Sequence, residues 1–168
     1  MRDMEALWEK LIDILEQEGA LYRDILELSR HKTETIVEGK VTALEQLTGV
    51  EHKMVINAGR LEQQREETVN QLAEDLKIKP EQLNFSLVVE KTEGKIRDRF
   101  LSYRDEIAVT LKELKEVNDL NSHLIKKSLE YIDFSINLIA GSSSEVTYND
   151  KKDGKGKDKG ASFFDKKV

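Results

Sequence analysis

Apolar residues recur along most of the chain at intervals of three and four, the spacing that places them on one face of an α-helix. In the first segment one stripe runs through Leu7, Leu11, Ile14, Leu21, Ile25 and Leu28, with Glu18 interrupting it. A second stripe beside it comprises Trp8, Ile12, Leu15, Tyr22 and Leu26. At about 100° per residue the two stripes form an arc wide enough to contact two neighbouring helices. The pattern predicts a long helix over residues 3–38, which Gly39 ends.

Two more long helices and one short helix are predicted after Gly39. A thinner apolar stripe predicts a helix over residues 40–77, which ends ahead of Pro80 because proline pushes the preceding residue out of the helical region. Residues 80–92 contain the run Leu87-Val88-Val89, which could be a strand, but nothing else in the chain could pair with it. We therefore expect a short helix there. Residues 94–140 have no proline and no internal glycine, and they predict a third long helix.

The apolar face of the third long helix widens toward its C-terminal half. Its first half has a narrow seam of about 80°, made of Phe100, Tyr103, Ile107, Leu111 and Leu114, which continues as Ile125, Leu129, Ile132, Ile136 and Ile139. Beside the continuation lies a second stripe of Val117, Leu120, Leu124, Tyr131 and Leu138, with Ser128 and Ser135 between the two. Either the first two helices cover both stripes, or one stripe stays open for the amphipathic helix of a partner protein.

These elements predict an all-α fold, an elongated antiparallel bundle of three long helices with a short connecting helix and coiled-coil-like up-down-up packing. We expect residues 1–140 to form this bundle and residues 141–168 to form a flexible tail that begins at Gly141 to Ser144. The stretch 151–160 has no apolar residue and cannot offset its ordering entropy, which predicts disorder. The net charge is +2 over residues 141–168 and −8 over the remainder.

Composition excludes several classes of protein. An acidic body is a poor nucleic-acid partner, since such affinity comes mostly from basic side chains that neutralise phosphates. The absence of cysteine excludes disulfides and thiolate chemistry. Apolar runs of about five residues are too short for a membrane span, which needs roughly 20, and the first residues lack the apolar core of a signal peptide. We expect a cytoplasmic protein without nucleic-acid binding or stable membrane insertion.

No constellation of residues predicts catalysis. His31, His52 and His123 lack metal-ligand neighbours, and neither a phosphate-binding glycine loop nor a G-x-S-x-G motif is present. We therefore expect no catalytic residues, no metal site, no cofactor and no enzymatic activity. Asn118 and Asn121 lie on or beside the seam of the third long helix. They either face solvent or fix the register of packing, as a buried asparagine can in a helical seam.

Several segments together resemble the FlgN-type flagellar export chaperones. The segments are Leu21 to Lys32 in the first helix, Leu61 to Arg65 in the second, and Asn118-x-x-Asn121-x-x-Leu124-Ile125 followed by Leu129 and Tyr131 in the third, where Ile125 replaces a leucine of the family pattern. The tail adds Thr147-Tyr148, a basic glycine-containing stretch and Phe164 to Lys167. The resemblance covers nearly the whole chain.

The resemblance implies a cytoplasmic chaperone of the flagellar type III export system. Such a chaperone binds hook–filament junction proteins, prevents their premature association and delivers them to the export gate. It implies substrate binding by the C-terminal part of the last helix, where the candidate residues are Val117, Leu120, Asn121, Leu124, Ser128, Tyr131, Ser135 and Leu138. It also implies docking to the export gate through Tyr148, although Tyr148 could instead pack on the bundle. The alternative function is a structural coiled-coil adaptor or oligomerisation module.

Overall fold

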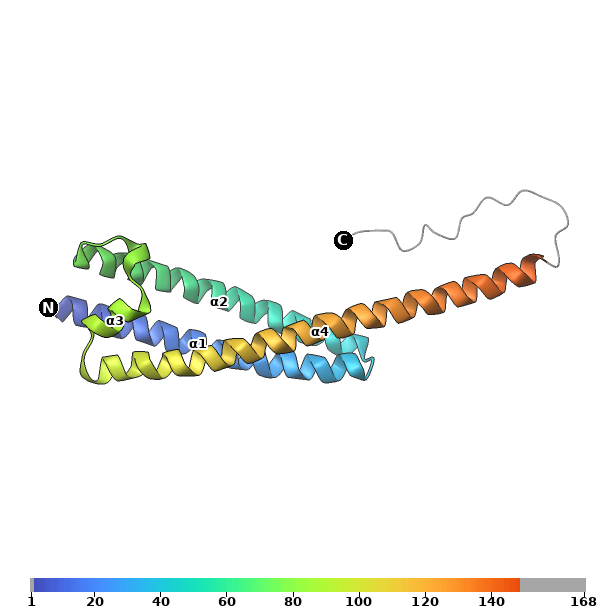
Figure 1. Cartoon of the computed structure of the whole chain (residues 1–168), viewed down its shortest axis with the longest axis horizontal. Coiled ribbons are helices and arrows are strands. Elements are labelled where there is room, and N and C mark those ends of the chain that lie inside the picture. Colours follow the sequence, from blue (N-terminus) through green and yellow to red (C-terminus); the bar gives the residue numbers. More distant parts are fainter. Residues whose placement is uncertain (1, 149–168) are drawn as a thin grey trace. The chain divides into compact units, whose positions relative to one another are not determined.

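The helices of this protein follow closely from the apolar pattern of the sequence. The computed structural model describes residues 2–148 and divides the chain into two compact units, Met1–Ile125 and Lys126–Val168. The elements are α1 (Arg2–Val37), α2 (Val41–Leu76), a 3-10 turn η1 (Pro80–Gln82), α3 (Phe85–Lys91) and α4 (Gly94–Tyr148) (Figure 1). The predicted all-α class is confirmed, and residues 2–148 contain no strand. The run Leu87-Val88-Val89 is helical, as expected.

Helices α1 and α2 pack side by side in opposite directions. Near the middle of α1, Glu18 lies 3.4 Å from the guanidinium of Arg65, and near its end Lys32 lies 2.6 Å from the carboxylate of Glu51. Partners on α2 therefore move toward the start of that helix as α1 advances. The reversal is made by Gly39, whose φ of +68° is a left-handed conformation that glycine adopts without the steric cost of a side chain.

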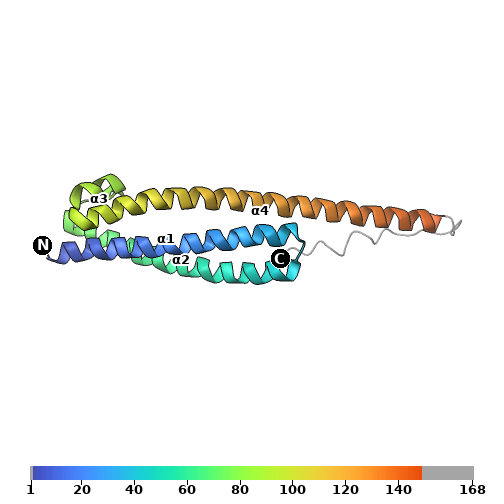
Figure 2. The ribbon, with the colours of Figure 1, turned by 90° about the horizontal axis from the view of Figure 1, so that it is seen from below.

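The first part of α4 returns alongside α1 in the same direction as α1. Arg99 binds Asp13 near the beginning of both helices, and Arg30 binds Glu113 further along, each at 2.6 Å. Figure 2 shows α4 beside α1 in this region, seen from below. The order α1, α2, α4 is thus up, down and up in the unit Met1–Ile125, as the sequence predicts.

The core of this unit lies where all four helices meet. The ring of Trp8 on α1 contacts the ring of Phe100 on α4 edge to face, with centroids 6.3 Å apart, and Phe85 on α3 contacts Phe100 in the same way. Leu72 of α2 and Ile12 of α1 are fully buried in this cluster. Edge-to-face aromatic pairs add to the free energy from burial, so the cluster anchors the start of α4 against α1, α2 and α3.

Helix α3 caps the core, and its ends use local hydrogen bonds. The side-chain oxygen of Asn84 accepts a hydrogen bond from the backbone N–H of Leu87 at 2.9 Å, which satisfies one of the free donors at the helix start. At the other end, the Thr92 hydroxyl donates to the carbonyl of Val88 at 2.7 Å. These bonds hold Val88 and Phe85 against the aromatic cluster.

The predicted end of α4 at residue 140 is wrong, because the helix continues to Tyr148. Gly141 and the serines that follow were expected to end it. A single glycine costs a helix only about 1 kcal/mol relative to alanine, and serine is a moderate helix former, so neither stops an established helix. The predicted boundary between a bundle and a tail at this point stays a prediction, and the expected disorder of residues 151–160 lies outside the described residues.

Candidate functional site

The eight predicted substrate-binding residues lie along α4, four in each unit. Within Met1–Ile125, Val117 and Leu124 are half-buried, Leu120 is exposed and Asn121 is buried. Within Lys126–Val168, Ser128, Tyr131 and Leu138 are exposed, and Ser135 is half-buried. The side chain of Tyr148, the predicted gate-docking residue, lies outside the described side chains, and its backbone forms the last position of α4.

The exposed part of α4, residues 126–141, has large apolar side chains on two faces. Each of these side chains is between 40% and 71% exposed. One face continues the seam of the first half, with Leu129, Ile132, Ile136 and Ile139, and the other contains Tyr131, Phe134 and Leu138. A contiguous apolar surface on a water-soluble helix is typical of an interaction site.

The large apolar side chains of residues 126–141 differ in exposure from the beginning of α4, and whether the first two helices cover both stripes there stays a prediction. Their exposed fractions are those of surface positions, whereas Phe100 at the start of the same seam is fully buried. Phe134 was missed in the sequence, although it lies three residues after Tyr131 and four before Leu138. That spacing places it on the same helix face, so the pattern contained the signal.

Asn121 holds α4 against α1 near the end of the first unit. It is 5% exposed, and its side-chain nitrogen donates to the backbone carbonyl of Ser29 at 2.9 Å. Its side-chain oxygen accepts from the hydroxyl of Thr33 at 2.5 Å. Both polar ends of the amide are therefore engaged inside the bundle. This geometry agrees with a role in register, whereas Asn118, the other candidate, is exposed.

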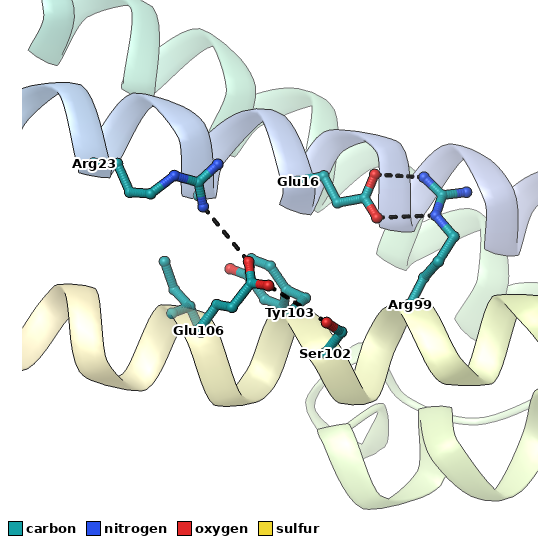
Figure 3. A pocket seen from close by; sticks show the side chains of 8 residues that line it. Glu16, Arg23, Arg99, Ser102, Tyr103 and Glu106 are labelled. Carbon is teal, nitrogen blue, oxygen red and sulfur yellow. Dashed lines mark hydrogen bonds and ion pairs between the residues drawn. The ribbon is translucent and has the colours of Figure 1, made fainter.

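A polar cavity of about 330 Å³ lies between α1 and α4, with Arg99 and Tyr103 among its lining residues (Figure 3). Arg99 donates two hydrogen bonds to Glu16, at 2.9 and 2.6 Å, and these bonds, together with one to Asp13, raise its pKa. Burial raises the pKa of Tyr103 to about 12, and the nearby Glu18 carboxylate adds to the rise. Arg99 is thus a paired cation and Tyr103 a neutral phenol at physiological pH, which suits helix pairing better than acid–base catalysis.

Glu18, which interrupts the first apolar stripe of the sequence, has a buried carboxyl group in the structure. Its side chain is 7% exposed and lies 3.4 Å from Arg65. Burial raises the pKa of Glu18, Arg65 lowers it in part, and Glu62 adds to the rise. A buried carboxylate that keeps only one partner costs free energy, so Glu18 is a weak point of the α1–α2 contact.

The described side chains offer no site for a metal ion. No group of three or more histidine, cysteine, aspartate or glutamate residues among them is arranged to hold one. His31 lines a hollow between α1 and α2, and no second histidine is among the residues that line it, which are Asp24, Glu27, Leu28, Leu47 and Met54. Within the described part of the chain, no helix is long and apolar enough to cross a membrane.

Comparison with known proteins agrees with the resemblance found in the sequence. The model of the FlgN protein family matches residues 1–155, which include all the helices described above. The uncharacterized protein YvyG of Bacillus subtilis (strain 168) is 24% identical over 139 residues, which span 83% of this chain and 84% of that protein. No solved structure matches the chain.

Proposed function

The chain belongs to the FlgN family, the flagellar export chaperone family, and we propose that it holds hook–filament junction proteins in the cytoplasm until they are exported. In this proposal the exposed part of α4 binds the substrate protein. The chain keeps that protein from associating prematurely and delivers it to the export gate.

The observation that carries the proposal is the exposure of both apolar faces of α4 over residues 126–141. A chaperone for an assembly subunit must cover the apolar face that the subunit later buries in its polymer. An amphipathic helix of the substrate could lie along α4 and place its apolar residues against Tyr131, Phe134 and Leu138, the helix-to-helix mode of recognition. Asn121 would contribute by holding α4 in place, since both ends of its amide bind α1.

The exposed apolar side chains of α4 can supply much of the free energy that a specific complex requires. Complete burial of one large apolar side chain contributes about 1.5–3 kcal/mol. Three or four such residues therefore offset much of the cost of association, which is of order 4–15 kcal/mol. The remaining affinity would come from the substrate's own apolar residues and from the second face, Leu129 to Ile139.

Tyr148 is the residue that we assign to the export gate. It ends α4, and twelve consecutive polar or glycine residues follow it in the sequence. An aromatic side chain at such a point can serve as an anchor for weak, reversible docking. The substitution Tyr148→Ala should impair export and spare the complex with the substrate; a weakened complex would contradict the assignment.

The direct test compares two neighbouring exposed positions of α4. Leu138→Asp introduces a charge on an apolar face, whereas Asn137→Asp introduces the same charge beside it on the polar side. Binding of purified hook–filament junction proteins, measured by calorimetry, should weaken at least tenfold in the Leu138 variant and stay nearly unchanged in the Asn137 variant. Circular dichroism of both variants checks that the helices remain folded. Equal affinities in the two variants would contradict the proposal.

Size exclusion with light scattering separates the chaperone from the alternative function. A chaperone of this kind should form a one-to-one complex with a junction protein. A structural adaptor would form a tight homo-oligomer through the same faces and no such complex, and that result would exclude the proposed function.

A further inference from the structure

The face of α4 formed by Tyr131, Phe134 and Leu138, here called the aromatic stripe, is among the most exposed apolar surfaces of the chain. These side chains are 71%, 59% and 57% exposed. Two of the three are aromatic, and spacings of three and four residues align them on one side of the helix. Contact with water is unfavourable for such a surface, which raises the question of what covers it before a partner arrives.

The chain contains a segment of matching chemistry close to its own end. Phe163 and Phe164 are the aromatic residues of positions 149–168, and they follow the polar and glycine positions 149–160. A short aromatic island behind a polar spacer can bury its rings only against another apolar surface. Aromatic rings favour aromatic partners in edge-to-face or offset contacts, and the aromatic stripe offers two of them.

The spacer has a suitable length for this contact. Tyr148, the last residue of α4, precedes Phe163 by fifteen positions. A glycine-containing polar chain of that length has a root-mean-square span of about 20–23 Å. Along the helix, Leu138 lies about 15 Å and Tyr131 about 26 Å from Tyr148. The most probable reach of the spacer thus coincides with the aromatic stripe.

Charge also favours the contact. Glu130 lies four residues before Phe134 and so borders the aromatic stripe, and Asp165, Lys166 and Lys167 follow the two phenylalanines. Lys127 already binds Glu130 at 3.2 Å, but both side chains are more than half exposed, so the pair is screened and weak. Additional lysines close to this edge would strengthen the attraction.

We infer that the segment Ala161–Val168 packs Phe163 and Phe164 against the aromatic stripe when no partner protein occupies it. The contact is intramolecular, and the spacer sets an effective concentration in the millimolar range. A contact with a bimolecular Kd of about 0.1 mM would then be about 90% formed and would weaken the binding of a competing partner about tenfold. The competition rests on the proposed function, whereas the packing itself does not.

Disulfide trapping in the full chain tests the packing. The chain has no cysteine, so pairs can be introduced freely. Ser135 lies four residues after Tyr131 and three before Leu138, so Ser135→Cys is combined with Ser162→Cys next to the phenylalanines. The matched control combines Ser135→Cys with Gly156→Cys, which shares the helix and part of the spacer and would react at a similar rate in a chain without the contact.

Under mild oxidation at low protein concentration, the Ser162 pair should close several-fold faster than the Gly156 pair. Adding Phe163→Ser and Phe164→Ser should abolish the difference. A Ser162 pair that is no faster than the control, or whose rate ignores the phenylalanine substitutions, would overturn the inference. Disulfide-linked dimers whose formation rises with concentration would also overturn it, since a second copy would then be the occupant.

A binding measurement separates this inference from the proposed function. In the chain without added cysteines, Phe163→Ser with Phe164→Ser should raise the affinity for a junction protein several-fold. The control Lys157→Ser with Asp158→Ser changes only the spacer and should leave the affinity unchanged. Fast trapping in a chain that binds no junction protein would support the inference and contradict the proposed function. Slow trapping in a chain that binds a junction protein would contradict the inference and support the proposed function.

Discussion

The two parts of α4 have the same apolar periodicity, but among the described side chains only those of the first part include fully buried ones. Up to Ile125 the seam contains the fully buried Phe100 and the buried polar residues Thr110 and Asn121, and Leu111 is 44% exposed. From Lys126 onward the same face contains Leu129, and the exposed fractions rise to those of a surface. Periodicity therefore identifies which face of a helix is apolar. It does not say whether that face is buried.

The largest expected difference in the free energy of unfolding is between alanine substitutions of the two phenylalanines of α4. Phe100→Ala is expected to destabilise the fold by about 3–5 kcal/mol because it leaves a cavity between Trp8 and Phe85. Phe134→Ala should change the free energy of unfolding by no more than about 0.5 kcal/mol, since that ring is 59% exposed. Urea unfolding of both variants measures the difference. Similar losses would mean that Phe134 is also part of the core.

The asparagines provide a second matched pair. Asn121→Ala should cost about 1–3 kcal/mol because the Ser29 carbonyl and the Thr33 hydroxyl lose a buried partner. Asn118→Ala should stay within about 0.5 kcal/mol at its exposed position. Thermal unfolding followed by circular dichroism distinguishes the two. An equal and small effect of both substitutions would remove the evidence that Asn121 sets the register of α4 on α1.

A third substitution acts on the exposed part of α4. Gly141→Ala should raise the local stability of the helix by about 0.5–1 kcal/mol, because glycine is a poor helix former and an added Cβ meets no atom within 4 Å. Slower amide hydrogen exchange around position 141, with an unchanged midpoint for unfolding of the bundle, is the expected result. A shift of the global midpoint would show that this part of α4 unfolds together with the bundle.

The smallest expected effect is on the pH dependence of stability, and it compares the buried Glu18 with the exposed Glu130. Burial raises the pKa of Glu18, so the folded protein holds this proton more tightly than the unfolded chain does. Stability therefore falls as the pH rises from the unfolded pKa through the raised one, and the cost persists at neutral pH. Glu18→Gln should be more stable than the natural chain at pH 7, with the gain shrinking toward pH 4.

The matched control for this substitution is Glu130→Gln. Glu130 pairs with Lys127 at the surface, with both side chains more than half exposed, and its replacement should leave the free energy of unfolding nearly unchanged at either pH. Denaturant unfolding at pH 4 and pH 7 measures both variants. A stability gain of Glu18→Gln that is the same at both pH values would contradict the assignment to a buried charge.

Much of the fold was accessible from the sequence because helix signals are local. Gly39 and Pro80 each mark a helix boundary through their own backbone geometry, and both predictions agree with the structure to within a few residues. The end of α4 was misplaced because Gly141 is only a weak break, and a helix can continue through it. The burial of Glu18 could not be predicted, because a charged residue within an apolar stripe indicates an exposed position. Only the packing of α2 on α1 shows that it is buried.

The candidate site was only half accessible from the sequence. The stripe through Tyr131 and Leu138 followed from spacing alone, and its role in substrate binding stays a prediction. The family match over residues 1–155 confirms the resemblance to the FlgN family. Asn121 could not be placed in the same way, because a polar residue beside a seam fits both a register contact and a binding surface. Its hydrogen bonds to α1 distinguish the two.

By itself, then, the sequence determined where the helices lie and which of their faces are apolar, since both depend on neighbours within a few positions along the chain. Only the tertiary structure decided how far the apolar face of α4 is covered. Arg99 binds Asp13, and Asn121 binds Ser29, which aligns α4 with α1 from its beginning. Within Met1–Ile125 this register decides which positions of α4 are buried, among them Phe100 and Asn121. The register depends on contacts between residues far apart in the chain, and no local pattern encodes it.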